Sequence, residues 1–471
     1  MGYRVSYLLT LLVVLGRACL LWGQSDPPPE YTWGTHRHGE LRSLIDEVPD
    51  YRATTLTGAW LKGRQELADE GIIVDGSIAQ FLQGTAHGGL DTNSGLSYFG
   101  APEVRVRLDF ARMGLWEGGF VSLRGGMQFG RSLNCRAGTL SPVNFAAVVP
   151  MVEEAGQVTL SEYYLAQALS EKFVVVAGKV DILNGSDNML LGSLERDQFL
   201  GAGMRTQPAL NPFIPHTTMV LAGIWLPNDR VRLMTGILDN DPADTAKTTG
   251  FSALFNGRDW FTVGQELDVK VAPWGRPGHQ TFGYAWRSRP YRLMQDRPDC
   301  DSGFPGLKEF LDPAFWCGAL DLARKRGIPP FFSSYRDSYH DWVVYYRFEQ
   351  YVHQEAEDPR QGWGFYGRLG LSTGKSNPIE RFYSLGWMGR GGIPERDNDN
   401  YGIGYYRSDM SDYLPDVLHV HSEQGVEMFY NMELRPGVRL TPDLQVIVNP
   451  GAGFQNRDVA IVYGLRLQIY F

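Results

Sequence analysis

The chain ends on a segment in which apolar side chains alternate with polar or small ones without interruption. Over residues 459–471, one face of a strand would be apolar or aromatic, and the other would include Gly464, Arg466 and Gln468. Because side chains of a strand point alternately to its two faces, one face favours an apolar medium while the other tolerates water. A final strand that ends on phenylalanine is typical of a bacterial outer-membrane barrel. The last strand of a soluble β-sandwich would show the same alternation, so the rest of the chain must decide.

About sixteen segments of this kind follow one another from Val74 onward, separated by clusters of Gly, Pro, Asn and Asp. An even number of short alternating segments predicts an all-β fold, namely a transmembrane antiparallel β-barrel of about 16 strands. The expected strands lie at 74–83, 103–111, 119–129, 157–169, 172–181, 217–226, 230–238, 260–271, 279–288, 339–350, 362–372, 380–388, 400–408, 424–435, 442–449 and 458–471.

The two faces of these segments favour a barrel over a sandwich. Val104, Val106 and Leu108 would share one face of a strand, and Arg105 and Arg107 the other. In a barrel the apolar face meets lipid, the charged face lines a lumen, and closure of the sheet satisfies every backbone group. Aromatic residues recur near segment ends, as interfacial girdles require. Some connections are very short, whereas others are long and predict extracellular loops at 130–156, 182–216, 239–259 and 289–338.

The N-terminus predicts export. Residues 1–23 have a short apolar run behind a positive charge, which indicates a secretory signal peptide because the run is too short to cross a bilayer as a helix. Residues 24–73 would form a leader with a short periplasmic helix over 57–70, capped by Thr57. Residues 74–471 would form the barrel, and the expected location is the cell outer membrane.

The charge balance of the exported chain is acidic. Without the signal peptide and its two arginines, the 44 basic residues fall to 42 against 53 acidic ones, a net charge near −11. Such a balance argues against nucleic acid as a partner.

The cysteines suggest a loop disulfide. Cys300 and Cys317 bracket an irregular segment rich in Pro, Asp and Gly, and an exported location permits a disulfide between them. A zinc site would need further ligands nearby. Cys135 would remain a free loop thiol, and no cofactor is predicted.

No catalytic constellation is found in the sequence. The stretch from Gly370 to Ser376 has one residue too few between its glycines for a phosphate loop, and it runs towards Pro378 instead of opening a helix. Glu153 and Glu154 are adjacent on an irregular loop, where they are poorly placed for glycoside hydrolysis. We therefore expect a protein that is not an enzyme.

Motifs spread over the whole exported chain carry a family pattern. They lie at 56–72, 104–119, 130–133, 161–164, 177–181, 440–451 and 463–468. In these stretches the chain resembles the carbohydrate-selective porins of the OprB type. The resemblance implies a single-chain outer-membrane barrel that admits monosaccharides or small oligosaccharides by passive diffusion. Its partners would be carbohydrates and the lipid and lipopolysaccharide of the outer membrane.

The alternation also predicts which side chains line the lumen. A sugar is neutral, carries many hydroxyls and has apolar ring faces, so a channel for it needs charged or amide groups and aromatic faces. Acidic and basic residues are interleaved here, which suits a neutral solute better than a ring of Arg and Lys alone. The alternative for each residue is that it pairs with another lumen charge and only stiffens the wall. The predicted substrate-contacting residues are Arg105, Arg107, Arg124, Glu162, Arg287 and Glu427, joined by Arg131 or Arg136 if the loop 130–156 folds inward.

Two other functions remain open at this point. A general or anion-selective porin would have the same fold and differ only in which solutes pass. A surface adhesin or receptor would display its long loops, 289–338 above all, on a plugged barrel, and conductance would separate it from a porin. The sequence also leaves open whether the barrel is a monomer or a homotrimer.

Overall fold

The computed structural model describes the barrel and part of the region that precedes it. Its described residues are 36–38, 41–44, 49–58, 62–92, 95–148, 156–182, 188, 191, 195–211, 213–214, 216–240, 261–288, 341–356, 358–375, 377–414, 420–453 and 459–471. The predicted signal peptide and both Cys300 and Cys317 lie outside them, so the signal peptide and the disulfide remain predictions.

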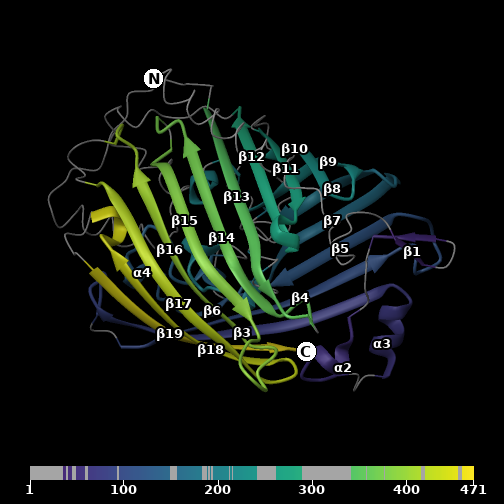
Figure 1. Ribbon diagram of the computed structural model, residues 1–471, viewed down its shortest axis with the longest axis horizontal. Coiled ribbons are helices and arrows are strands. Elements are labelled where there is room, and N and C mark those ends of the chain that lie inside the picture. The colour runs from purple at the N-terminus through teal and green to yellow at the C-terminus, as the bar shows by residue number, and fades with distance from the viewer. Residues whose placement is uncertain are drawn as a thin grey trace.

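Sixteen long strands pair antiparallel in sequence order and close on themselves as a barrel (Figure 1). They are β3 (Ile72–His87), β4 (Ser97–Asp109), β5 (Gly119–Gly126), β7 (Thr159–Ser170), β8 (Phe173–Asp181), β9 (Thr217–Asn228), β10 (Val231–Asp239), β11 (Phe261–Val271), β12 (Gly278–Arg287), β13 (Asp341–Gln354), β14 (Gly362–Ser372), β15 (Ile379–Arg390), β16 (Asn400–Met410), β17 (Ser422–Arg435), β18 (Val438–Val448) and β19 (Val459–Tyr470). The two-residue β6 (Phe129–Gly130) pairs with β4. Every predicted segment coincides with one of the sixteen strands, so the predicted barrel is confirmed.

The barrel closes between its first and last strands. β19 pairs with β3, for example through Ile469 and Ile78 or Leu465 and Leu82, and the Phe471 N–H donates to the Gly76 carbonyl at 2.8 Å. The alternating C-terminal segment is therefore the closing strand of a barrel.

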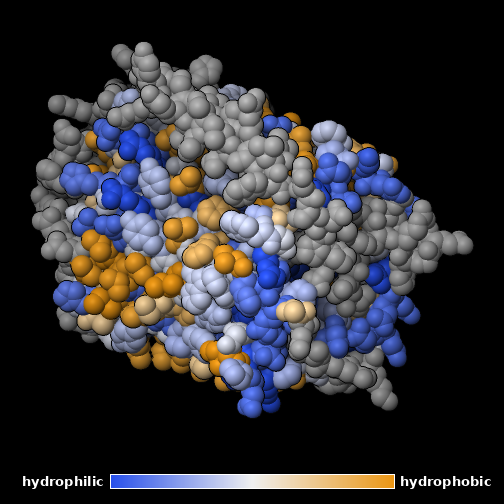
Figure 2. Space-filling model, in the orientation of Figure 1, coloured by the Kyte–Doolittle hydropathy of each residue, from blue (hydrophilic) through white to orange (hydrophobic). Residues whose placement is uncertain are grey.

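The outer face of the barrel is apolar. Every long strand exposes at least one large apolar or aromatic side chain, such as Val104 on β4 and Leu221 on β9, and Figure 2 shows such side chains gathered on the wall that faces the viewer. Along β19, Leu465 is 39% exposed, whereas its neighbour Arg466 on the other face is 1% exposed. This is the alternation of a barrel that presents apolar side chains to lipid and polar ones to its lumen.

Several strands extend further than the sequence predicts, β4 and β18 among them. β4 begins at Ser97, well before the expected position 103, because Phe99 and Ala101 face inward and pack against Leu200 instead of meeting water. Inward apolar residues of this kind hide the alternation. β18 begins at Val438 and contains Pro442, which pairs with Leu465 on β19 within the ladder.

The region before the barrel forms short elements at one rim. They are β1 (His36–His38), β2 (Leu41–Ser43), α2 (Tyr51–Thr54) and α3 (Lys62–Asp69), and Figure 1 places α2 and α3 beside the C-terminus. Ala68 of α3 packs on Tyr51 and Ile73, which fixes the helix against the start of β3. The expected cap is wrong, because the Thr57 hydroxyl has no hydrogen-bond partner among the described residues and α3 begins only at Lys62.

The helices elsewhere in the described residues are short. They comprise α4 (Asn134–Ala137), α6 (Ala202–Arg205) and the 3₁₀ turns at Phe145–Ala147, Glu195–Asp197, Pro208–Leu210, Pro273–Gly275 and Pro450–Gly453. In the described part of the chain, no helix has both the length and the apolar character needed to span a bilayer.

Two connections at the opposite rim fold into the lumen. We call residues 139–148, between β6 and β7, the first inner segment, and residues 195–211, between β8 and β9, the second inner segment. Phe199 and Met204 of the second inner segment are buried against Tyr366 and Phe429, whose side chains point inward from β14 and β17. The hydrophobic core of this molecule therefore lies inside the barrel, between the inner segments and the wall formed by β12–β19, β3 and β4.

Candidate functional site

The second inner segment crosses the lumen from one part of the wall to another. At one end, the Arg196 guanidinium lies 2.7 Å from the Glu103 carboxylate on β4. Further along, the Met204 carbonyl accepts a hydrogen bond of 2.5 Å from Arg368 on β14. Since β4 and β14 lie far apart in the order of strands around the barrel, the segment narrows the lumen instead of lying along one side of it.

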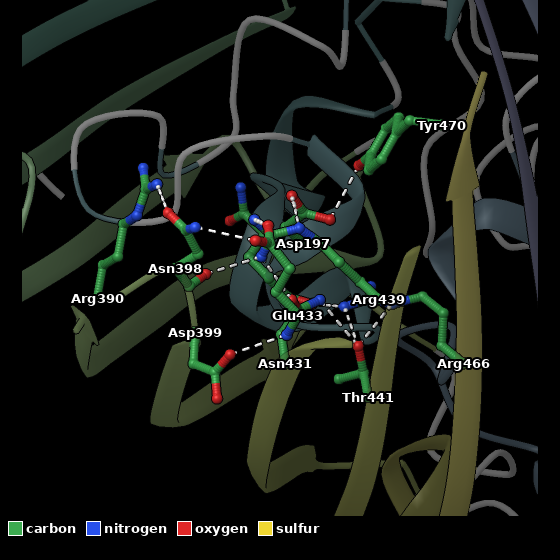
Figure 3. Close-up of polar contacts among 11 residues, drawn as sticks. Asp197, Arg390, Asn398, Asp399, Asn431, Glu433, Arg439, Thr441, Arg466 and Tyr470 are labelled. Atoms are coloured by element: carbon green, nitrogen blue, oxygen red, sulfur yellow. Dashed lines mark hydrogen bonds and ion pairs between the residues drawn. The ribbon is translucent and has the colours of Figure 1, made fainter. Parts of the chain in front are cut away.

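A polar network fixes the middle of this segment to β17–β19 (Figure 3). Asp197 accepts a hydrogen bond of 2.9 Å from the Tyr470 hydroxyl and lies 3.4 Å from the Arg439 guanidinium. Arg466 donates to the Gln198 carbonyl at 2.9 Å, and Arg439 also pairs with Glu433 at 2.9 Å. These side chains converge on the segment from neighbouring strands, so many contacts must break before it can move.

Four of the six predicted substrate-contacting residues lie together on β4, β5 and β7. Arg105 and Arg107 are on β4, and Arg105 is paired in register with Arg124 on β5, which in turn is paired with Glu162 on β7. Arg124 is 2% exposed and forms ion pairs with Glu103 at 2.7 Å and with Asp181 at 3.3 Å. Its position is that of a wall-stabilising arginine.

The other members of this group differ in how far they are engaged. Glu162 is buried and accepts a hydrogen bond of 2.7 Å from Ser122. Arg107 is partly exposed and pairs with Asp75 at 2.7 Å. For the partly exposed Arg105, by contrast, the described residues provide no hydrogen bond and no ion pair, and its Nε is buried without a partner. Arg105 is therefore the arginine of this group best placed to meet a solute.

The remaining two predicted residues lie elsewhere. Arg287, at the end of β12, pairs with Asp341 at 2.6 Å and stacks over the Phe213 ring at 5.0 Å. Glu427 on β17 lies beneath the second inner segment and accepts hydrogen bonds from the backbone N–H groups of Leu200 and Gly201. Both side chains are buried, so neither faces open lumen.

The loop that was expected to fold inward does so in part. Its described residues include the first inner segment, but Arg131 is exposed, and Arg136 donates to Ser97 at 2.8 Å and to the Gly95 carbonyl at 2.8 Å. The inward course of the second inner segment was not anticipated from the sequence.

A second polar group lines β10–β13. Glu266 lies 3.4 Å from Arg232 and 3.3 Å from Arg347, and it accepts a hydrogen bond of 2.9 Å from Tyr345. The Asp268 carboxylate accepts a hydrogen bond of 2.8 Å from the Thr281 hydroxyl, and it lies 3.2 Å from Nδ1 of His279. Alternation places these residues on the inner face, but nothing in the sequence indicates that they meet in one cluster.

Between the two polar groups the inner wall is apolar. Val176 on β8 is paired with Ala222 on β9, and Ile224 on β9 is paired with Met234 on β10. Met234 is in turn paired with Glu266, so these aliphatic side chains share the inner face with the polar group of β10–β13. The wall thus offers aliphatic surface flanked by charges.

The inner wall thus carries both acidic and basic side chains, which can accept and donate hydrogen bonds. Within the part of the chain that the structure describes, no three His, Cys, Asp or Glu side chains are grouped so that they could hold a metal ion.

The comparison with known families agrees with this architecture. The sequence model of the carbohydrate-selective porin family OprB matches residues 93–471, which include every strand from β4 to β19. The chain belongs to the OprB family. The resemblance noted in the sequence is confirmed, and the fold and family are those of an outer-membrane channel.

Two porins are similar to parts of this OprB-family chain. Porin B of Pseudomonas aeruginosa is 27% identical over 155 residues, which are 29% of this chain and 34% of that protein. Porin AaxA of Chlamydia pneumoniae is 29% identical over 106 residues, which are 22% of this chain and 24% of that protein. The chain thus spans about a third of the length of the first relative and about a quarter of the second.

A solved structure supports the OprB fold over nearly the whole chain. The high-pH structure of Pseudomonas putida OprB superposes with a TM-score of 0.72 at 17% identity, and the alignment covers 90% of this chain and 100% of that one. At this identity the likeness shows the fold alone.

Proposed function

We propose that this protein is an outer-membrane porin through which carbohydrates, either monosaccharides or small oligosaccharides, diffuse passively and selectively. The observation that carries the proposal is a lumen narrowed by an inner segment, with acidic and basic side chains paired along its wall. Paired charges give a neutral polyhydroxyl solute many donors and acceptors, yet give an ion of either sign little net attraction. Membership of a carbohydrate-selective family supports the same solute class.

In this proposal the solute passes between the β4–β7 group and the β10–β13 group. Arg105 and Arg107 would donate hydrogen bonds to sugar hydroxyls on one side, and Glu266 and Tyr345 would face them on the other. The aliphatic wall between the groups would lie against the apolar face of a sugar ring. Arg124, Glu162, Arg287 and Glu427 would act by holding the wall and the inner segment.

The outer surface supports a monomer in outer-membrane lipid and lipopolysaccharide. Each of the sixteen long strands exposes a large apolar side chain, including Phe365 on β14 and Leu444 on β18. A trimer would cover part of the circumference with a flatter and less aromatic face. Mass measurement of the detergent-solubilised protein tests this, and a stable trimer would contradict it.

Liposome swelling tests the proposed function. The refolded protein is reconstituted, and swelling is compared in glucose, maltose, an amino acid and an organic anion of similar size. Faster swelling in the sugars than in size-matched solutes is the expected result. Rates set by size alone would point to a general porin, and a preference for the anion to an anion-selective one. An absence of swelling by inserted protein would favour an adhesin or receptor.

A further inference from the structure

We propose that Glu423 and Glu427, on the inner face of β17, are positioning residues that set the aperture of the lumen by clamping both inner segments. The inference rests on the proposed porin function, but it concerns the width of the path and not the chemistry of the solute. Both side chains are almost fully buried, so they act on the protein and not directly on a passing molecule.

Glu427 holds the second inner segment through its backbone. The Leu200 N–H donates to Oε1 at 2.5 Å, and the Gly201 N–H donates to Oε2 at 3.0 Å. These two amides stand at the start of the short helix α6, where amide groups have no helical partner. A carboxylate can accept several such hydrogen bonds at once, which a neutral side chain cannot match.

Glu423 holds the first inner segment in the same way. It accepts hydrogen bonds from the Leu140 N–H at 2.5 Å and the Ser141 N–H at 2.8 Å. It also accepts from the Gly451 N–H at 2.7 Å and from the Tyr406 hydroxyl at 2.8 Å. One carboxylate thereby joins this segment to the β18–β19 connection and to β16.

The two clamps act on a single body. Phe145 donates its N–H to the Leu200 carbonyl at 2.8 Å, and Ala202 donates to the Pro142 carbonyl at 2.9 Å. The inner segments are thus hydrogen-bonded to each other. Since residues four apart on a strand share a face, β17 presents both carboxylates to this body from the same side. Releasing one segment would therefore loosen the other.

The fit at Gly201 leaves no spare room. A Cβ atom at this position would lie 2.5 Å from Glu427 Oε2, so an alanine must displace either the carboxylate or the segment, and either movement breaks their hydrogen bonds. The absence of a side chain at residue 201 is what lets the backbone reach the carboxylate. A substitution at Gly201 can therefore break the contact between the second inner segment and Glu427 without altering any charge in the lumen.

The first experiment measures single-channel conductance and the size cut-off for malto-oligosaccharides in reconstituted full-length protein. Glu427→Ala and Glu423→Ala are expected to raise conductance roughly twofold or more and to admit longer oligosaccharides, because the inner body moves away from β17. Glu427→Gln keeps one oxygen within reach of both N–H groups but loses the charge, so its conductance should lie between those of the wild type and Glu427→Ala.

Asp109→Ala serves as the matched control. Asp109 is likewise a buried carboxylate that accepts hydrogen bonds from two backbone N–H groups, those of Ala111 at 3.0 Å and Arg112 at 3.2 Å. It lies at the end of β4, at the rim opposite to the one from which the inner segments enter the lumen. The conductance of the folded Asp109→Ala variant should stay at the wild-type level.

The second experiment separates positioning from charge. Gly201→Ala should widen the pore as Glu427→Ala does, although no charge is removed. In the double variant Gly201→Ala/Glu427→Ala, the steric conflict is gone, so its conductance should match that of Glu427→Ala and not the sum of the two effects. Retention of heat-modifiable migration in gels shows that each barrel is folded.

Wild-type conductance and cut-off in folded Glu427→Ala and Gly201→Ala would overturn the proposal. The proposal would also be overturned if conductance rose in Glu427→Ala but not in Gly201→Ala, since the carboxylate would then act through its charge. Failure of the proposed sugar selectivity would look different. The wild-type protein would then show no preference for sugars, while the variants would still differ from it in size cut-off.

Discussion

At the scale of single residues, inward charges divide into those with partners in the wall and those without. Arg124 and Arg105 are register neighbours on adjacent strands, yet Arg124 is held by two carboxylates, and Arg105 is held by none of the described side chains. The alternation of the sequence places both on the inner face but contains no information on which of them is paired. That difference depends on Glu103 and Asp181, which folding brings to Arg124.

This contrast gives the first prediction. Arg105→Gln should leave the stability of the barrel unchanged and lower its permeability to anions relative to cations, because an accessible positive charge is lost. Arg124→Gln should destabilise the fold by about 3–5 kcal/mol, since the buried Asp181 loses its ion pair with Arg124 and Glu103 keeps only that with Arg196. Reversal potential in a salt gradient reports the first effect, and urea unfolding in lipid reports the second. An unchanged reversal potential in Arg105→Gln would contradict its placement at the solute path.

His216, just before β9, gives a prediction on pH. Burial lowers the pKa of His216 to about 4, below its ordinary value of about 6.5, and its Nδ1 has no partner among the described residues. Between about pH 4 and pH 6.5, His216 is therefore protonated in the unfolded chain and neutral in the folded one. The stability contributed by neutral His216 is complete above about pH 6.5 and declines as the pH falls towards 4.

We expect His216→Gln to lose part of this acid sensitivity. The check is the difference in unfolding midpoint between variant and wild type, measured in urea at several values between about pH 7 and pH 4.5. A difference that does not change over this interval would show that His216 does not titrate as described.

At the scale of elements, the strands were predictable and the inner segments were not. A barrel strand alternates between lipid-facing apolar and lumen-facing polar side chains, so neighbouring residues such as Val104 and Arg105 are enough to identify it. The second inner segment has no such requirement, because its apolar Phe199 meets inward-facing residues of β14 and β17 that are remote in sequence. The same packing explains why glycine is needed at Gly404, where a Cβ would lie 2.8 Å from the Met204 sulfur and closer still to the Tyr366 hydroxyl.

The packing of Phe199 can be tested directly. This ring is fully buried and lies 4.7 Å from the Phe429 ring and 5.8 Å from the Tyr366 ring. Phe199→Ala should destabilise the docked segment by about 3–5 kcal/mol through the cavity it leaves. Protease added outside proteoliposomes should then cut the second inner segment faster than in the wild type, while the strands stay intact. Equal cleavage would mean that the polar network of Asp197 holds the segment without this ring.

At the scale of the whole molecule, the outer surface is adapted to lipid. Leu465, at the middle of β19, is exposed on the outer face, whereas Leu434 is exposed near the end of β17. A charge on the lipid face costs most at the bilayer midplane and little near the interface. Leu465→Arg should therefore destabilise the folded barrel by about 2–4 kcal/mol, and Leu434→Arg by at most about 1 kcal/mol. Unfolding in urea in the presence of vesicles measures both, and equal costs would mean that the wall does not face a bilayer.

The closing pair of β3 and β19 has a consequence for the order in which the molecule forms. Ile78 and Ile469 lie opposite each other in the ladder of β3 and β19, yet almost the whole chain lies between them. Hairpins of neighbouring strands can form early, but the pairing of β3 with β19 needs the last strand of the chain. Contacts of such high sequence separation slow folding. Until then β3 offers an unpaired edge, which other strands could join. Of all the strand pairings of the barrel, this one closes the longest stretch of chain and so has the largest loop-closure entropy.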